Sequence, residues 1–319
     1  MDCFVAPLLA MTGRIEGEAG LTISFEGRVA IVTGAGGGLG RAYALELARR
    51  GAAVVVNDLG GARDGSGGGD AAARVVAEIE GGGGRALANC ASVTDEEQVA
   101  AMVREAQAAF GRVDILINNA GILRDKSFAK MDLDDFRAVV DVHLIGSANC
   151  TRAVWGLMRD QGYGRILMTS SSTGLFGNFG QANYGAAKLG LLGLAKTLAL
   201  EGARYDIRVN TIAPTAATRM TQDLFPPELF ALFRPELVAP AALFLVSQDA
   251  PTNAIVGAGA GVVQAAYITL TAGAVLPEED RTPEAVAALW ERITNREGET
   301  VPQSGAEQAQ SILMRLQGR

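Results

Sequence analysis

Three side chains in the middle of the chain have the types and the spacing that proton-transfer chemistry requires. Tyr184 follows Ser171 by thirteen residues, and Lys188 follows the tyrosine by four. Residues four apart on a helix share one face, so the Lys188 ammonium can lie beside the Tyr184 phenol. A free phenol has a pKa of about 10. A neighbouring cation lowers that pKa and makes the tyrosine a usable base, while Ser171 is expected to hydrogen-bond the reacting oxygen.

A glycine-rich turn upstream supports this interpretation, which matters because a tyrosine–lysine pair alone is more often an ordinary buried tyrosine beside an exposed lysine. The turn lies between an apolar run over 28–33, typical of a buried strand, and a helical pattern over 41–50. Glycines let the backbone approach a phosphate, and the helix N-terminus offers free N–H groups and a positive dipole end. The context therefore predicts a pyrophosphate cradle. Its cofactor-binding positions are Gly34, Gly38, Leu39 and Gly40.

Asp58 ends the next predicted strand, over 52–58, and bears on the choice of cofactor. A carboxylate there can accept hydrogen bonds from the adenosine ribose hydroxyls and repels a 2′-phosphate. No cation directly follows Asp58, although Arg41 and Arg63 are near enough in the sequence to leave NADP as an alternative. The other interpretation of Asp58 is a turn residue that leads into the glycine-rich loop. We favour the ribose contact and therefore NAD.

Strand and helix patterns alternate from residue 28 onward, which predicts βαβ units and a parallel sheet. The expected strands cover 28–33, 52–58, 85–90, 115–117, 165–169 and 208–212, and the expected helices cover 41–50, 70–80, 95–110, 134–159 and 183–203. The fold class is therefore α/β, a doubly wound parallel sheet (Rossmann fold) with helices on both faces and a C-terminal extension. Ligands bind such a sheet at the carboxyl ends of its strands. The motif residues that follow a predicted strand are Gly34, Asp58, Ser92, Val93, Asn119, Ser171 and Pro214.

Composition limits the partners. The chain has 319 residues, is 49% hydrophobic, and carries a net charge of −7 without a basic run, so neither nucleic acid nor an anionic membrane surface is an expected partner. It has one histidine and three cysteines (Cys3, Cys90 and Cys150) without metal-like spacing. We therefore expect no metal site. Free thiols are typical of a reducing compartment, which indicates a cytoplasmic protein.

Three segments are expected along the chain. Residues 1–24 read as a disordered N-terminal extension, residues 25–255 as the NAD-binding domain, and residues 256–319 as a C-terminal extension of an interface strand and helices. The stretch 250–277 contains no charged residue, which raises the possibility of a membrane span. Its many glycines and its polar residues argue against a spanning helix. We instead expect a last core strand followed by an added strand at a subunit interface.

The motif set resembles the short-chain dehydrogenase/reductase family over roughly 26–250. The matching residues are Thr33-Gly34-xxx-Gly38-x-Gly40, Asn118-Asn119-Ala120-Gly121, Ser171 and Tyr184-xxx-Lys188. The resemblance implies reversible hydride transfer between NAD and a secondary alcohol, with Tyr184 and Lys188 also close to the nicotinamide ribose. It further implies cofactor contacts from Ser92, Val93, Asn119, Ala120, Gly121, Pro214 and Thr218. His143 stands where the family commonly has an asparagine whose backbone carbonyl holds a proton-relay water, and its side chain could add a group that titrates near pH 6.5. The alternative interpretation of His143, given equal weight, is a histidine packed within the helix.

A narrower resemblance concerns the substrate. Residues 56–61, 119–125, 177–184 and 213–221 are similar to the (3R)-hydroxyacyl-CoA dehydrogenase unit of peroxisomal multifunctional enzyme type 2 and its bacterial relatives. This implies a (3R)-3-hydroxyacyl-CoA substrate, a 3-ketoacyl-CoA product and a homodimer. The alternatives are a dehydrogenase for another bulky secondary alcohol, such as a steroid or a polyketide-like acid, and a non-catalytic NAD-sensing module.

Overall fold

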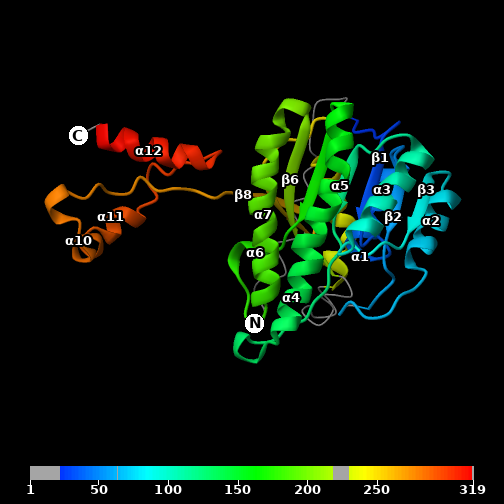
Figure 1. Ribbon diagram of the computed structural model, residues 1–319, viewed down its shortest axis with the longest axis horizontal. Helices are drawn as coiled ribbons and strands as arrows, with labels where there is room; N and C mark the ends of the chain where they lie inside the picture. Colours follow the sequence, from blue (N-terminus) through cyan, green and yellow to red (C-terminus); the bar gives the residue numbers. More distant parts are fainter. Residues whose placement is uncertain (1–21, 63, 218–229, 318–319) are drawn as a thin grey trace.

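The centre of the computed structural model, which describes residues 22–62, 64–217 and 230–317, is a twisted sheet covered by helices (Figure 1). The described residues form eight strands in the order β3-β2-β1-β4-β5-β6-β7-β8. The strands are β1 (Val29–Thr33), β2 (Ala53–Asn57), β3 (Arg85–Asn89), β4 (Ile115–Asn118), β5 (Gly164–Thr169), β6 (Ile207–Pro214), β7 (Ile255–Gly259) and β8 (Val262–Ala266). Neighbouring strands are parallel except β7 and β8. The chain order reverses between β1 and β4, which is where ligands bind in such sheets.

Helices cover both faces of the sheet, as the alternating pattern predicted (Figure 1). One face packs against α1 (Gly38–Arg49), α2 (Ala71–Gly81) and α9 (Ala239–Phe244). The other face packs against α3 (Glu96–Phe110), α5 (Gly146–Gln161) and α7 (Ala182–Gly202). Adjacent side chains of β1 alternate between the two layers, because Ala30 and Val32 join the first core cluster and Ile31 joins the second. Burial on both faces explains why the strands read as continuous apolar runs.

Local sequence signals set the ends of the helices. Asp95 caps α3, since its Oδ1 accepts from the backbone N–H groups of Glu97 and Gln98, both at 3.0 Å. Gly111 ends the helix in the left-handed conformation, at φ +82°. The short helix α6 (Ser172–Phe176) begins at Ser171, whose side chain is its cap. Ser171 is therefore held by local structure at the end of β5.

The single helix expected over 134–159 is interrupted. It consists of α4 (Leu133–Val140), a π-helical turn over Asp141–Ile145, and α5. At the end of the turn, Gly146 packs so tightly that an added Cβ would lie 2.6 Å from the Val93 side chain. Turns of this type are frequent at functional sites, and this one carries His143.

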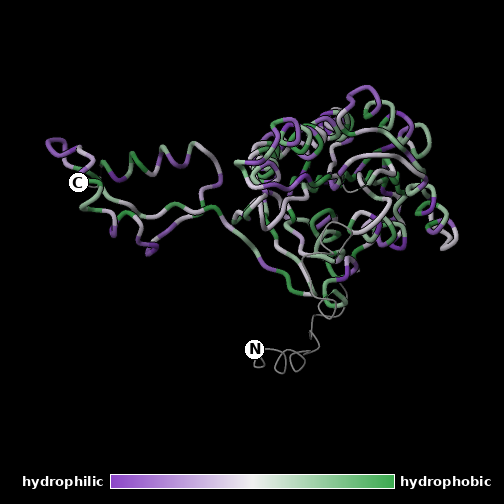
Figure 2. The backbone as a smooth tube through the Cα atoms, turned by 90° about the horizontal axis from the view of Figure 1, so that it is seen from below, coloured by the Kyte–Doolittle hydropathy of each residue, from purple (hydrophilic) through white to green (hydrophobic). Residues whose placement is uncertain are grey.

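Residues 250–266 contain the last core strand and the added strand that the sequence predicted, as β7 and β8. The expected domain boundary at 255/256 falls inside β7, after the first residue of this strand of the central sheet. Beyond β8, residues 267–317 leave the body of the protein as an arm (Figures 1 and 2). The arm carries α10 (Pro283–Ala288), α11 (Trp290–Thr294) and α12 (Gly305–Gln317).

Two further expectations concern the ends of the chain and membranes. Most of the N-terminal extension expected over 1–24 lies outside the described residues, which begin at residue 22. Within the described parts of the chain, no helix combines the length and the apolar character that crossing a bilayer requires.

Candidate active site

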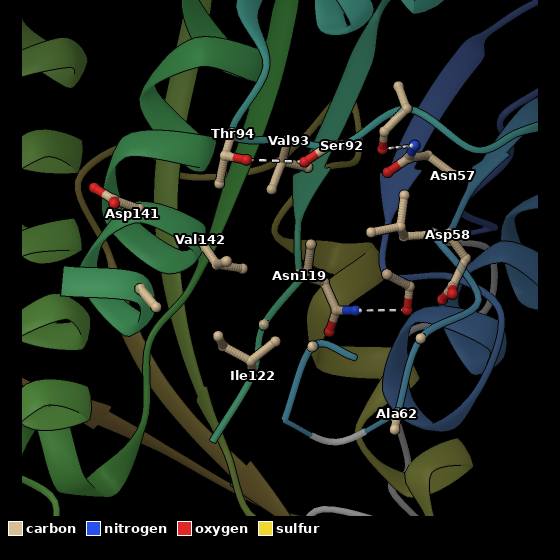
Figure 3. Close-up of a pocket in the computed structure, with 18 of the residues that line it drawn as sticks. Asn57, Asp58, Ala62, Ser92, Val93, Thr94, Asn119, Ile122, Asp141 and Val142 are labelled. Carbon is tan, nitrogen blue, oxygen red and sulfur yellow. Dashed lines mark hydrogen bonds between the residues drawn. The ribbon is translucent and has the colours of Figure 1, made fainter. Parts of the chain in front are cut away.

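A cavity of about 490 Å³ opens at the carboxyl edge of the sheet, where the strand order reverses (Figure 3). Its walls come from the segments that follow β1, β2, β3 and β4, together with α4 and the π-helical turn. The structure brings nine of the predicted cofactor residues to its lining: Gly34, Gly38, Leu39, Asp58, Ser92, Val93, Asn119, Ala120 and Gly121.

The glycines of the turn after β1 are required by close backbone contacts. An added Cβ on Gly34 would lie 2.8 Å from the Ala120 Cα, and the Gly34 φ is +63°. Gly40 does not line the cavity, but its Cβ would lie 2.3 Å from the Gly34 carbonyl oxygen. Gly40 therefore lets α1 approach the turn, while the N-terminus of α1 at Gly38 stays open towards the cavity. This cradle, which larger side chains would fill, fits a dinucleotide pyrophosphate.

Asn119 ties the ends of β1 and β4 together. Its Nδ2 donates to the carbonyl oxygens of Thr33 (3.0 Å) and Gly34 (3.1 Å). Thr33 Oγ1 in turn accepts from the backbone N–H groups of Asn119 and Ala120, both at 3.0 Å. The shape of the cavity floor therefore depends on a small polar network between two neighbouring strands.

Asp58 holds the backbone on either side of it. Its Oδ2 accepts from Gly36 N at 2.8 Å, and its Oδ1 accepts from Gly60 N at 2.7 Å. Each carboxylate oxygen has a second lone pair, so the contacts leave acceptor capacity for ribose hydroxyls. Arg41 is engaged elsewhere, because it donates to both carboxylate oxygens of Glu78 at 2.6 and 2.7 Å. Arg63, the other cation considered for a 2′-phosphate, lies outside the described residues.

Sequence reasoning gave no role in the site to the glycine-rich loop after Asp58 or to Arg124, which contacts it. Arg124 Nε donates to the Asp64 carbonyl oxygen at 3.2 Å, and Arg124 also lines the cavity. Gly65 packs against Ile122, so that an added Cβ would lie 3.1 Å from the Ile122 Cγ2. The run of glycines over 60–69 was a visible signal of tight packing, but nothing local indicates what the loop packs against.

Ser171, Tyr184, Lys188 and His143 come together beside this cavity. The Ser171 side chain lies close enough to the Tyr184 hydroxyl to act on its pKa. Lys188 Nζ lies 5.4 Å from the centroid of the Tyr184 ring and donates to the Thr169 carbonyl oxygen at 2.6 Å. The His143 ring meets the Tyr184 ring edge-on, with centroids 5.1 Å apart. The predicted spacing therefore does correspond to a three-dimensional cluster.

The electrostatics of the cluster differ from the prediction that the lysine would lower the tyrosine pKa. Burial raises the pKa of Tyr184 to about 12, although the nearby Ser171 side chain acts in the opposite direction. Burial also lowers the pKa of Lys188 to about 7, since its ammonium is removed from water. In the protein without cofactor or substrate, desolvation thus outweighs the attraction between the Lys188 cation and the Tyr184 phenolate. Tyr184 holds its proton at neutral pH.

Two other sequence expectations need comment. Burial and the nearby Lys188 charge hold the pKa of His143 well below 6.5, so the expectation of a group titrating near that pH is wrong. Pro214 ends β6 and does not belong to the residues that line the cavity, and Thr218 lies outside the described residues. Among the described residues, no group of three or more His, Cys, Asp or Glu side chains is arranged to hold a metal ion.

Comparison with known proteins identifies the relatives of the chain. Residues 28–229 match the short chain dehydrogenase family. The chain is 53% identical over 275 residues to a short-chain type dehydrogenase/reductase of Mycobacterium tuberculosis, covering 85% of this chain and 95% of that protein. It is 49% identical over 295 residues to mouse peroxisomal multifunctional enzyme type 2, covering 91% of this chain but only 40% of the mouse enzyme. The solved structure of a 7α-hydroxysteroid dehydrogenase complexed with NADH and 7-oxo glycochenodeoxycholic acid superposes with a TM-score of 0.67 at 32% identity, covering 76% of this chain and 96% of that one.

Proposed function

The chain belongs to the short-chain dehydrogenase family, and from this premise we propose that it is an NAD-dependent dehydrogenase of (3R)-3-hydroxyacyl-CoA. As a member of that family it is an oxidoreductase with a nicotinamide cofactor. The observation that carries the proposal is the cluster of Ser171, Tyr184 and Lys188 beside a cavity with a glycine cradle. The acyl-CoA substrate follows from the narrower resemblance described above. The 49% identity to mouse peroxisomal multifunctional enzyme type 2 supports it.

Each residue of the cluster has a definite role in the proposed reaction. Bound NAD would supply the hydride acceptor. In alcohol oxidation, the deprotonated Tyr184 Oη takes the hydroxyl proton as the carbon loses hydride, and in ketone reduction the protonated phenol donates that proton. Ser171 Oγ holds the substrate oxygen where charge develops. Lys188, whose Nζ donates to the Thr169 carbonyl oxygen, would bond the nicotinamide ribose, as the family resemblance implies.

The preference for NAD over NADP rests on Asp58. Its carboxylate is fixed by two backbone N–H groups at the cavity wall, so a 2′-phosphate would meet a negative charge that cannot turn away. We expect NAD to bind more tightly than NADP by at least tenfold, as measured by titration of the purified protein. Equal affinities would contradict this part of the proposal.

We also propose that the enzyme is a homodimer in which the arm packs on a second copy. The arm exposes large apolar side chains that find no cover within the described residues of one chain. They are Tyr267, Trp290, Ile312, Leu313, Met314 and Leu316. Such a surface is typical of a protein interface. Sedimentation equilibrium is expected to give twice the 33.1 kDa chain mass. The double variant Trp290→Ser, Leu313→Ser is expected to lower the measured mass towards that of the monomer.

The location of the protein is part of the same proposal. Cys90 and Cys150 are free thiols in the structure, which fits a reducing compartment such as the cytoplasm.

The central test supplies the purified protein with NAD and, separately, the (3R)- and (3S)-3-hydroxyacyl-CoA of medium chain length, and follows NADH absorbance. We expect turnover of the (3R) form alone. Tyr184→Phe is expected to lower kcat by about 10²- to 10⁴-fold, which is the usual worth of a general acid–base group, without loss of NAD binding. Tyr205→Phe, at the other end of the same helical region, is the matched control. Turnover of neither acyl-CoA, with NAD still bound, would refute the substrate and direct attention to other secondary alcohols.

A further inference from the structure

A second cavity lies at the opposite edge of the sheet from the candidate active site. It measures about 460 Å³, within the ~300–1,000 Å³ range of small-molecule sites. Of its lining residues, Arg28 stands directly before β1, and Arg165 and Arg208 are the second residues of β5 and β6. The cavity therefore lies where these parallel strands begin, whereas the cofactor cavity lies where they end.

The wall of this second cavity is built around one aromatic ring. The Arg28 guanidinium lies 3.7 Å from the centroid of the Tyr163 ring, and the Arg165 guanidinium lies 4.1 Å from it. Arg165 is buried, and its register partner on the neighbouring strand is Arg208. Asp206 joins these two arginines, since it accepts from Arg165 Nη2 at 3.1 Å and from Arg208 Nε at 3.0 Å. Three guanidinium groups are thus held together at one edge of the sheet.

Two of the three arginines keep hydrogen-bond donors available. All the nitrogen donors of Arg165 are engaged, because Nε, Nη1 and Nη2 each donate to protein oxygens. Within the described part of the chain, Arg28 donates only through Nη1, to Asp114 at 3.0 Å, and Arg208 donates only through Nε and Nη1. Burial raises the pKa of Tyr163 above its ordinary value of 10, so its hydroxyl keeps a proton to donate.

The charge balance of the lining favours an anion. The three arginines face two carboxylates on the lining, those of Asp206 and Asp249. Asp249 is exposed, so water and salt screen its charge. The neighbouring pair of Arg112 and Asp114 adds one charge of each sign. An excess of positive charge therefore remains beside the free donors.

A phosphate group suits these donors better than a carboxylate does. Guanidinium forks bind both kinds of anion, but a terminal phosphate has three acceptor oxygens and a carboxylate has two. Two forks from separate strands and a phenol hydroxyl can therefore all be used by one phosphate. We propose that this cavity is a second ligand site, which binds the phosphate group of a small phosphorylated molecule between Arg28 and Arg208. The proposal is independent of the dehydrogenase activity, because no residue lines both cavities.

The test measures amide hydrogen exchange of the whole chain with inorganic phosphate, with glycerol 3-phosphate, and with chloride at equal ionic strength. We expect both phosphates, but not chloride, to slow exchange over the segments 163–166 and 205–209. The concentration dependence of this protection gives a Kd for each compound. A lower Kd for glycerol 3-phosphate would show that the cavity also holds the rest of an ester, and equal values would show that it recognises the phosphate group alone.

Three variants locate the binding. Arg208→Gln is expected to raise the Kd at least tenfold, equivalent to about 1.4 kcal/mol. Tyr163→Phe keeps the ring between the guanidinium groups and removes only the hydroxyl, so it provides a second test if the arginine variant does not fold. It is expected to raise the Kd by about three- to tenfold. Arg204→Gln is the matched control, because this arginine also stacks on a tyrosine, Tyr205, but lies outside the cavity lining. It is expected to leave the Kd unchanged.

Three results would overturn the second site. The first is equal exchange in phosphate and in chloride, which would reduce the effect to ionic screening. The second is protection confined to the glycine turn over 34–40, which would place the phosphate in the cofactor cradle instead. The third is an unchanged Kd in both Arg208→Gln and Tyr163→Phe. A protein that binds phosphate here but turns over no alcohol would refute the proposed function and leave this site standing.

Discussion

Replacing Lys188 by methionine should abolish turnover and yet make the isolated protein more stable at neutral pH. The Lys188 side chain is 3% exposed, and Nζ donates to the Thr169 carbonyl oxygen. Removal from water lowers its pKa from 10.5 to about 7. Methionine has a similar length and fills the same space without an ammonium to desolvate.

The size and sign of the effect follow from proton linkage. A shift from 10.5 to about 7 corresponds to a penalty of about 5 kcal/mol at and below pH 7, at about 1.4 kcal/mol per pKa unit. Lys188→Met removes this penalty. Loss of the Thr169 hydrogen bond and imperfect packing offset part of the stability gained, so we expect the variant to be more stable than the wild type by about 3 kcal/mol at pH 7. Between pH 7 and pH 10.5 the unfolded lysine is protonated and the folded one is neutral. The wild type therefore gains about 1.4 kcal/mol per pH unit as pH rises through this window, and it loses that stability as pH falls towards 7.

The assay is denaturant unfolding of the wild type and the variant at several pH values from 7 to 9.5, without cofactor and at one protein concentration. The difference in free energy of unfolding should shrink from about 3 kcal/mol at pH 7 to near zero at pH 9.5. Other titrating groups cancel, since they are common to both proteins. Lys196→Met, a partly exposed lysine on the same helix, controls for the loss of an amine. A difference that stays constant over this pH range would refute the buried, neutral lysine.

Three further predictions concern the cofactor site and the tyrosine. Gly40→Ala should weaken NAD binding by about ten- to a hundredfold in a fluorescence titration. The reason is that its Cβ would lie 2.3 Å from the Gly34 carbonyl oxygen, and overpacking of this kind costs about 1–3 kcal/mol. Alcohol oxidation should speed up from pH 7 to pH 10, since the Tyr184 pKa is raised to about 12 and oxidation needs the phenolate; a rate independent of pH would argue against tyrosine as the base. Asp58→Ala should lower NAD affinity by more than about tenfold, since it loses the ribose contact and the bond to Gly36 N. The same variant should reduce the ratio of NAD affinity to NADP affinity.

The core of the fold could be predicted from the sequence because its signals are local. Buried parallel strands produce continuous apolar runs, and helices such as α3 carry apolar residues at helical spacing between a capping aspartate and a glycine. The interruption of the helix over 134–159 was not predicted from the sequence. The π-helical turn forms where Gly146 must pass the Val93 side chain, which comes from another loop.

The sequence by itself determined which residues could do the chemistry. Spacing along one helix places Tyr184 and Lys188 on one side, and the end of a predicted strand places Ser171 at the edge where ligands bind. These conclusions need only periodicity and strand direction, which are properties of short segments. They hold in the structure because α7 and β5 form where the sequence predicts them.

Only the tertiary structure decided how those residues are tuned. The pKa values of Tyr184 and Lys188 depend on desolvation by every neighbouring element, and desolvation raises the Tyr184 pKa, which the lysine was expected to lower. The contact of His143 with Ile122 joins residues 21 positions apart in sequence. Such contacts arise from the packing of separate elements, and no pattern within either segment records them.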